Sequence, residues 1–220
     1  MVTAAENAYD RIRRGILSGE FPPNSRLKEE ELVRCCGVSR TPVREALRRL
    51  AAEDFVRIIR NQGAEVRSWS DEDLDDLFEL RTLLEGHAAR RAAERIDDTG
   101  LERISAAVDE TEALLAGPEQ PEHWVEEFQR LNRIIHETVW HASGSPRLTS
   151  MLGHLVEQAL MLRTIRHFSL DRASQSNGHH RELLGALTAR DPVWAESVMR
   201  SHIRAARITL QTPSTGGRSD

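Results

Sequence analysis

The sequence predicts a mainly α-helical protein in two parts, here called the head (residues 1–69) and the body (residues 70–211). Apolar residues recur at helical spacing along most of the 220 residues, and one pattern of two short strands interrupts them near residue 60. Charge also differs between the parts: the head holds 13 Arg or Lys against 10 Asp or Glu, whereas the whole chain has a formal net charge of -5. A basic head on an acidic body indicates a polyanionic partner for the head alone.

Several classes of protein are excluded by what the sequence lacks. No uncharged apolar run reaches about 18 residues, so we expect no membrane partner. The first residues, MVTAAENAYDRIRRG, lack the apolar block of a secretory signal, and we therefore expect a cytoplasmic protein. The two cysteines, Cys35 and Cys36, are adjacent and cannot supply a disulfide framework or the spaced ligands of a structural zinc module.

Three helices are predicted in the head, over residues 4–18, over residues 29–36, and from Ser39 to about Leu50. The second helix ends at Gly37, a residue suited to the left-handed conformation of a helix end. The third opens with Ser39 as its cap and with Pro42 in the first turn, where a missing amide hydrogen is harmless. The short turn between the second and third helices predicts a helix-turn-helix.

A β-hairpin is predicted after the third helix. Residues 55–59 are apolar and β-branched, residues 60–63 form a turn, and residues 64–67 return. The head is therefore predicted to be a winged helix-turn-helix domain with a two-stranded wing.

The third helix carries a row of arginines opposite its predicted buried stripe, which consists of Val43, Ala46, Leu47 and Leu50. Arg40, Arg44 and Arg48 recur every four residues and project along one ridge. A helix inserted into the major groove of DNA meets base edges mainly with its N-terminal residues, so Arg40, Thr41 and Arg44 are best placed to read sequence. Arginine suits this role because its planar fork donates two hydrogen bonds to one guanine. From spacing alone, a merely solvated row of arginines is the alternative.

The body is predicted to be a bundle of six or seven helices. Ser70 caps a long first helix that runs to about Arg95. Breaks rich in Gly and Pro separate the later helices, which we expect over residues 98–116, 122–142, 146–167, 172–189 and 192–211. The final residues, 212–220, are rich in Ser, Thr and Gly, and we expect a disordered tail.

Histidines on the apolar faces of three body helices suggest a metal site. His136, His180 and His202 each share a stripe with apolar residues, and the amide of Asn132 lies one helical turn before His136. Side chains from facing helices can converge on one cation in a bundle core. Each histidine taken singly is also explained as a hydrogen-bonded core residue.

The head resembles a known family. Residues 6–67, and above all the motif GVSRTPVREALRRL, are similar to the DNA-binding domain of GntR-type bacterial transcription regulators. The resemblance implies that Ser39, Arg40, Thr41 and Arg44 contact the operator, and that residues Asn61, Gln62 and Gly63 form the wing tip. Relatives often carry arginine at the position of Gln62, and some carry one at the position of Glu30, so both departures remove positive charge.

The body resembles the FCD ligand-binding domain of one GntR subfamily, the FadR/FCD regulators. The similarity covers residues 74–210, beginning DLFELRTLLEGHAARRAAERI. It implies a divalent metal at Asn132, His136, His180 and His202. The usual first ligand is aspartate, which Asn132 replaces with a neutral amide. Zinc, nickel and manganese all remain open.

The expected function is a homodimeric transcription regulator, most simply a repressor, that reads a palindromic double-stranded DNA operator twice. A small carboxylate effector, an organic or sugar acid, would occupy free coordination positions of the metal. Arg81 is a candidate second anchor for it, the alternative being a surface pair with Glu85 one turn away.

Other functions stay open from the sequence. The metal can be purely structural, or the regulator can respond to the metal itself. A metal-dependent enzyme is disfavoured and we expect none, because the stretch from His136 to His141 has one residue too many for the metalloprotease motif HExxH, which places both histidines on one helix face.

Overall fold

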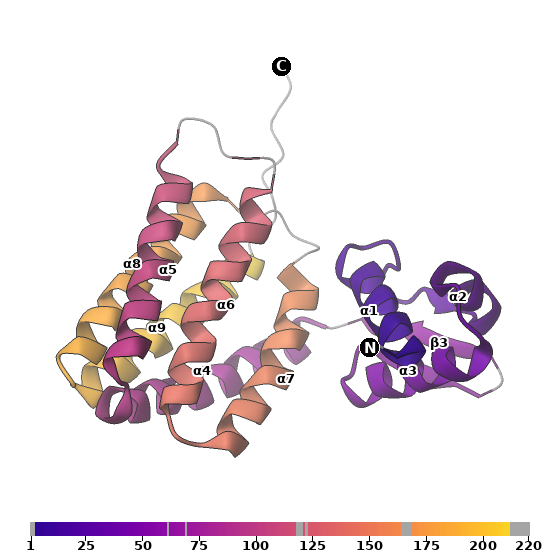
Figure 1. The fold of residues 1–220 in the computed structure, drawn as a ribbon, viewed down its shortest axis with the longest axis horizontal. Helices are drawn as coiled ribbons and strands as arrows, with labels where there is room; N and C mark the ends of the chain where they lie inside the picture. Colours follow the sequence, from indigo (N-terminus) through magenta and orange to yellow (C-terminus); the bar gives the residue numbers. More distant parts are fainter. Residues whose placement is uncertain are drawn as a thin grey trace. The chain divides into compact units, whose positions relative to one another are not determined.

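The computed structural model describes residues 3–60, 62–68, 70–117, 121, 123–163 and 169–211. The chain forms two compact units, the first built mainly on Met1–Leu74 and the second mainly on Asp75–Val156 and the helices that follow (Figure 1). Asn61 of the predicted wing tip and the predicted tail, 212–220, lie outside the described residues. The boundary between residues 69 and 70 stays a prediction.

The first unit is a helix-turn-helix with a small sheet, which confirms the predicted fold class. Its elements run in the order α1 (Ala4–Leu17), β1 (Arg26–Leu27), α2 (Glu29–Cys36), α3 (Arg40–Ala52), β2 (Val56–Ile59) and β3 (Gly63–Val66). Gly37 ends α2 with φ of 66°, the left-handed conformation that its lack of a side chain permits. Ser39 stands at the cap position of α3, but its side chain does not accept the expected hydrogen bond from an amide of the first turn, so that part of the prediction was wrong.

The wing has a third strand that the sequence pattern did not predict. Strand β3 pairs antiparallel with β2 on one side and with β1 on the other, and Leu27 lies opposite Ala64. Gly63 is required for this pairing, because its φ is +94° and an added Cβ would lie 2.2 Å from the carbonyl oxygen of Leu27. A strand of two residues is too short to show an alternating pattern, which explains the omission.

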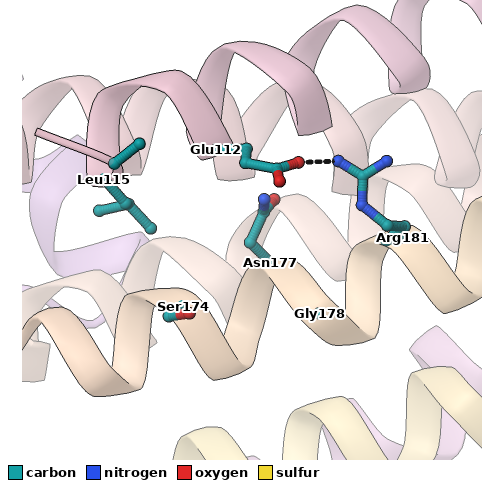
Figure 2. Close-up of a pocket in the computed structure, with 7 residues that line it drawn as sticks. Glu112, Leu115, Ser174, Asn177, Gly178 and Arg181 are labelled. Atoms are coloured by element: carbon teal, nitrogen blue, oxygen red, sulfur yellow. Dashed lines mark hydrogen bonds and ion pairs between the residues drawn. The ribbon is translucent and has the colours of Figure 1, made fainter.

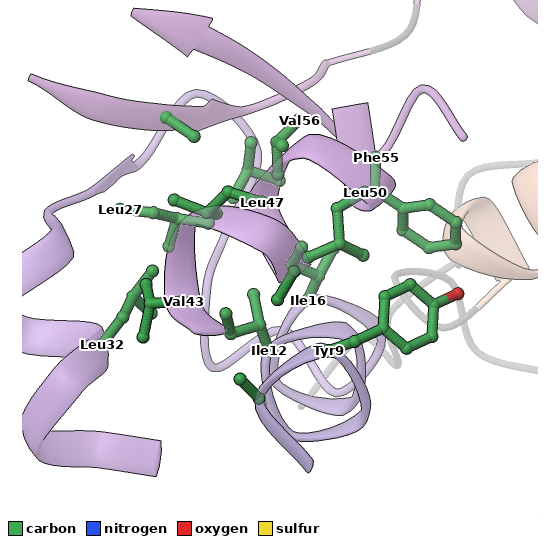
Figure 3. Close-up of a cluster of buried hydrophobic side chains, with 14 residues drawn as sticks. Tyr9, Ile12, Ile16, Leu27, Leu32, Val43, Leu47, Leu50, Phe55 and Val56 are labelled. Atoms are coloured by element: carbon green, nitrogen blue, oxygen red, sulfur yellow. The ribbon is translucent and has the colours of Figure 1, made fainter. Parts of the chain in front are cut away.

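The hydrophobic core of the first unit anchors one side of α3. Figure 3 shows buried side chains from α1, α2, α3 and the sheet meeting in one cluster, among them Ile12, Leu32, Leu47, Leu50 and Phe55. All four residues predicted for the inner stripe of α3 are buried: Val43, Ala46, Leu47 and Leu50. Because this stripe faces the core, the opposite side of α3 is presented to solvent.

The second unit is a helical bundle, as predicted. Its helices are α4 (Asp71–Arg95), α5 (Asp98–Leu115), α6 (Trp124–Ala142), α7 (Pro146–Arg163), α8 (Leu170–Thr188) and α9 (Pro192–Gln211). Ser70 caps α4, since its hydroxyl accepts from the amide of Asp73 while the Asp73 carboxylate accepts from the amide of Ser70. Helix α8 begins two residues earlier than expected, because Ser169 caps it.

The bundle brings distant helices together. Helix α5 packs against α6 and α8, and α8 packs against α9, so these four run alongside one another in Figure 1. Among the described helices, none combines the length and apolarity needed to cross a membrane.

Candidate nucleic-acid interface and metal centre

The exposed side of α3 presents the predicted DNA-contacting residues together. Ser39, Arg40, Thr41, Arg44 and Arg48 are all exposed, and all five belong to α3 or to its cap position. Since the inner stripe is anchored in the core, the ridge stands on a rigid base. A rigid helix with three cations along one side is suited to a polyanionic groove.

Two of these arginines pair with the first turn of α2. A terminal nitrogen of Arg40 lies 3.0 Å from Oε1 of Glu30, and Nε of Arg44 donates to both oxygens of Glu29 at 2.9 and 3.0 Å. The bond to Glu29 raises the pKa of the Arg44 guanidinium, which is charged at neutral pH in any case. The arginine ridge is thus partly neutralised by α2.

The two described residues of the predicted wing tip differ in their exposure to solvent. Gln62 is exposed, and its Oε1 accepts a hydrogen bond from Arg26 at 3.1 Å. Gly63, in contrast, is half-buried and belongs to β3, where its close approach to Leu27 shapes the sheet. Among the two described residues of the predicted tip, Gln62 is therefore the one whose side chain can reach a ligand.

The three predicted histidines converge in the core of the bundle. His136 on α6, His180 on α8 and His202 on α9 are buried, and one ring nitrogen from each lies within 4.8 Å of the others. The Nε2 atoms of His136 and His202 are 3.1 Å apart. Nitrogens bound at about 2.1 Å to one ion are about 3.0 Å apart at right angles and about 3.4 Å apart in a tetrahedron, so this spacing fits two ligands of one cation.

Asn132 supplies an amide on the same helix as His136. The two residues are one turn apart on α6, so they project from the same side of it. The Asn132 Oδ1 atom is buried, and within the described part of the chain it has no hydrogen-bond partner. Buried oxygens are normally satisfied, so a buried oxygen that accepts no hydrogen bond suits a ligand of a cation.

A buried carboxylate, Glu85, orients the first histidine. The Nδ1 atom of His136 lies 2.5 Å from Glu85 Oε2, and Nε of Arg81 donates to Glu85 Oε1 at 2.8 Å. The indole nitrogen of Trp140 donates to Oε2 at 3.4 Å. When Nδ1 of a histidine donates to a carboxylate, its Nε2 keeps a lone pair available to a metal.

The sequence-based alternative for Arg81 was half correct. Arg81 does pair with Glu85, but the pair lies in the core rather than on the surface, with side chains 6% and 0% exposed. Burial tends to raise the pKa of the Glu85 carboxyl, but Arg81 first and then His136 outweigh that effect and lower the pKa to about 2. Glu85 is therefore ionised, and its charge is balanced by Arg81.

Sequence reasoning missed the role of Glu85 beside His136, although a signal was present. Glu85 lies one helical turn before Ala88 and Ala89, so small residues share its face of α4. Small residues on one helix face indicate close packing against a neighbour, and a carboxylate within such a face is expected to have buried partners.

A separate cavity of about 290 Å³ lies between α5 and α8. Figure 2 shows Asn177 of α8 beneath an ion pair between Glu112 of α5 and Arg181 of α8. Nδ2 of Asn177 donates to the carbonyl oxygen of Val108 at 3.1 Å, which ties the two helices together. None of the residues predicted for the metal or effector lines this cavity.

Comparisons with known proteins agree with both halves of this description. Residues 4–66 match the family described as bacterial regulatory proteins, gntR family, and residues 76–205 match the FCD domain. The chain belongs to the GntR family of bacterial transcription regulators. It is a DNA-binding regulator whose body is an FCD domain.

Two relatives of this GntR regulator align with nearly the whole chain. The transcriptional repressor GlaR of Escherichia coli is 26% identical over 220 residues, covering 98% of this chain and 100% of that one. A probable D-xylose utilization operon repressor of Paenarthrobacter nicotinovorans is 28% identical over 217 residues, covering 98% and 92%. The structure of E. coli McbR/YncC is similar with a TM-score of 0.79 at 21% identity, covering 96% and 98%, and supports the fold.

Proposed function

We propose that this regulator binds a palindromic operator as a homodimer and releases it when a small carboxylate binds beside a divalent cation in the body. We infer a dimer because one recognition helix reads only a few base pairs. Two heads that read a palindrome would supply the missing sequence specificity. Two relatives that align with nearly the whole chain are named as a repressor and a probable repressor, which favours repression by occupancy of the operator.

In the head, we assign base contacts to Arg40, Thr41 and Arg44. Their exposure near the start of α3 supports this assignment, since that end of a recognition helix meets base edges. We assign contacts to the DNA backbone to the remaining residues proposed for the interface, which are Ser39, Arg48, Asn61, Gln62 and Gly63.

In the body, Asn132, His136, His180 and His202 would hold the cation. Zinc, nickel and manganese are all compatible with imidazole and amide donors. When bound, the ion supplies a positive centre that attracts a carboxylate. The four protein donors are neutral, and the nearby charge of Glu85 is already balanced by Arg81. This charge balance carries the proposal, because a divalent cation in such a site gains most from an anionic ligand.

We also propose that Arg81 contacts the carboxylate effector. Its Nε and a terminal nitrogen both lie 2.8 Å from Glu85 Oε1. A carboxylate effector would therefore have to share the Arg81 guanidinium with Glu85 or displace that carboxylate. If neither occurs, Arg81 acts by holding Glu85 against His136.

Helix α4 offers a route for coupling between effector and DNA. The helix begins at Asp71, directly after the head in sequence, and carries both Arg81 and Glu85. An effector shifts the equilibrium between two arrangements of the dimer only if it binds one of them more tightly. We infer that an acid bound at the cation favours an arrangement of α4 that is incompatible with simultaneous contact of both heads with the operator.

The test uses a duplex selected by the protein itself from a pool of random sequences. Fluorescence anisotropy would follow release from this duplex while small carboxylic acids are added to metal-free protein and to protein loaded with zinc, nickel or manganese. We expect at least one acid to release the loaded protein and not the metal-free protein. Release by metal alone would indicate a metal-responsive regulator, and no release under any condition would leave the ion a structural role; either result would overturn the proposal.

A further inference from the structure

The first turn of α2 places three consecutive carboxylates beside α3. Glu30 pairs with Arg40 and Glu29 pairs with Arg44, whereas Glu31 pairs with Lys28 at 3.1 Å. Two of these carboxylates thus hold the arginines assigned to base reading, and the third holds a cation outside α3. The choice of partner therefore depends on the position of each glutamate on α2, because all three carry the same charge.

The bonds between Arg44 and Glu29 leave donors for DNA. Nε of Arg44 donates to both oxygens of Glu29, so the two terminal nitrogens remain for O6 and N7 of a guanine. A base contact can therefore form while the pair persists. If Arg44 turned to a phosphate instead, it would leave the carboxylate near the duplex with its charge uncompensated, which is unfavourable.

Their exposure shows that these pairs are weak. The side chains of Arg40 and Glu30 are 61% and 77% exposed, and those of Arg44 and Glu29 are 57% and 25% exposed. Water screens such pairs, so they do not lock the arginines in place. The pairs shift the balance between operator and random DNA without preventing binding to either.

We propose that Glu29 and Glu30 determine sequence specificity by holding Arg44 and Arg40 away from phosphates and in position for a matching base edge. They act as positioning residues and need no contact with a base themselves. The proposal concerns the head alone and is independent of the cation and the effector, but it rests on the base contacts assigned above to Arg40 and Arg44.

The test compares Glu29→Gln and Glu30→Gln with Glu31→Gln in the full-length protein. All three variants gain one unit of charge on the same turn, so Glu31→Gln controls for net charge. Affinity is measured on the duplex selected by the unaltered protein and on a scrambled duplex of the same composition, over a range of salt concentrations. Circular dichroism melts of each variant check that the head remains folded.

We expect Glu29→Gln and Glu30→Gln each to bind scrambled DNA about threefold to tenfold more tightly and selected DNA less than about twofold more tightly, so that discrimination falls. The slope of log affinity against log salt on scrambled DNA should steepen by about one as the freed arginine contacts a phosphate. Glu31→Gln should leave the discrimination ratio unchanged.

Two results would overturn the inference. One is an equal loss of discrimination in all three variants, which would leave only a net-charge effect; the other is unchanged discrimination in Glu29→Gln and Glu30→Gln. Arg44→Ala on the same duplexes separates this from failure of the assigned base contacts. If Arg44→Ala loses affinity for selected DNA while the glutamine variants discriminate normally, the base contact stands and the inference about the carboxylates fails.

Discussion

Two arginine–glutamate pairs of nearly equal length show how differently the head and the body use the same chemistry. Arg44 and Glu29 in the head are 2.9 Å apart, and Arg81 and Glu85 in the body are 2.8 Å apart. The first pair is open to solvent, whereas the second is 6% and 0% exposed. The exposed pair is free to exchange partners, while the buried pair is part of the folded core.

The largest predicted effect is the loss of stability on removing the buried arginine. Arg81→Met leaves the Glu85 charge buried beside His136 with its strongest partner gone, and we expect it to lower the free energy of unfolding by about 3–5 kcal/mol. Urea unfolding of the metal-free protein, followed by circular dichroism, measures this loss. Arg44→Ala is the control from the head and should keep the urea midpoint of the parent; equal midpoints for both variants would contradict the comparison.

The next largest effect concerns metal binding in the body. We expect His180→Ala to weaken binding of the cation by more than about a hundredfold, because it removes one of three imidazoles that converge on a single point. Elemental analysis of the purified protein checks the metal content. His141→Ala provides the matched control, since His141 lies on α6 with His136 but is exposed. Unchanged metal in the His180 variant would refute the assigned site.

A smaller effect is predicted for DNA binding by the head. Arg44→Ala should weaken binding to the self-selected duplex by about tenfold to a hundredfold and should change binding to scrambled DNA little, because a base contact is lost rather than a phosphate contact. Anisotropy titrations on both duplexes measure this difference. Equal loss on both would reassign Arg44 to the DNA backbone.

The smallest effect tests the neutral donor in the metal site. Asn132→Asp should tighten metal binding by about tenfold, since a carboxylate compensates the charge of a divalent cation better than an amide does. Competition with a chromophoric chelator measures the affinity. The same variant should need more of any active acid for release from DNA, and a variant released more easily than its parent would weigh against charge balance as the basis of effector binding.

Much of the fold could be predicted because its signals are local. The apolar stripe of α3, the left-handed Gly37 and the Ser70 cap each depend on neighbouring residues, and each is present as expected. Strand β1 was missed because two residues carry no periodicity. The absent cap bond of Ser39 shows that a suitable residue at a cap position does not ensure the hydrogen bond.

The candidate site was predictable in its ligands but not in its surroundings. Helical spacing places His136, His180 and His202 on inner faces, so their convergence follows once the helices pack. The burial of Arg81 and the contact between Glu85 and His136 depend on how α4 lies against α6, which no local pattern specifies. The pairs between α2 and α3 were missed for the same reason.

The short strand β1 makes the head a single cooperative unit. It lies before α2 and α3 in sequence, yet Leu27 is paired with Ala64, which follows both helices. The sheet therefore joins strands that lie before and after the helix-turn-helix in sequence. Because β3 is the central strand, it cannot leave the sheet without also releasing the segment that leads into α2. Amide protons of β3 should accordingly exchange with solvent only when the whole head unfolds, which would let the head fold and act without support from the body.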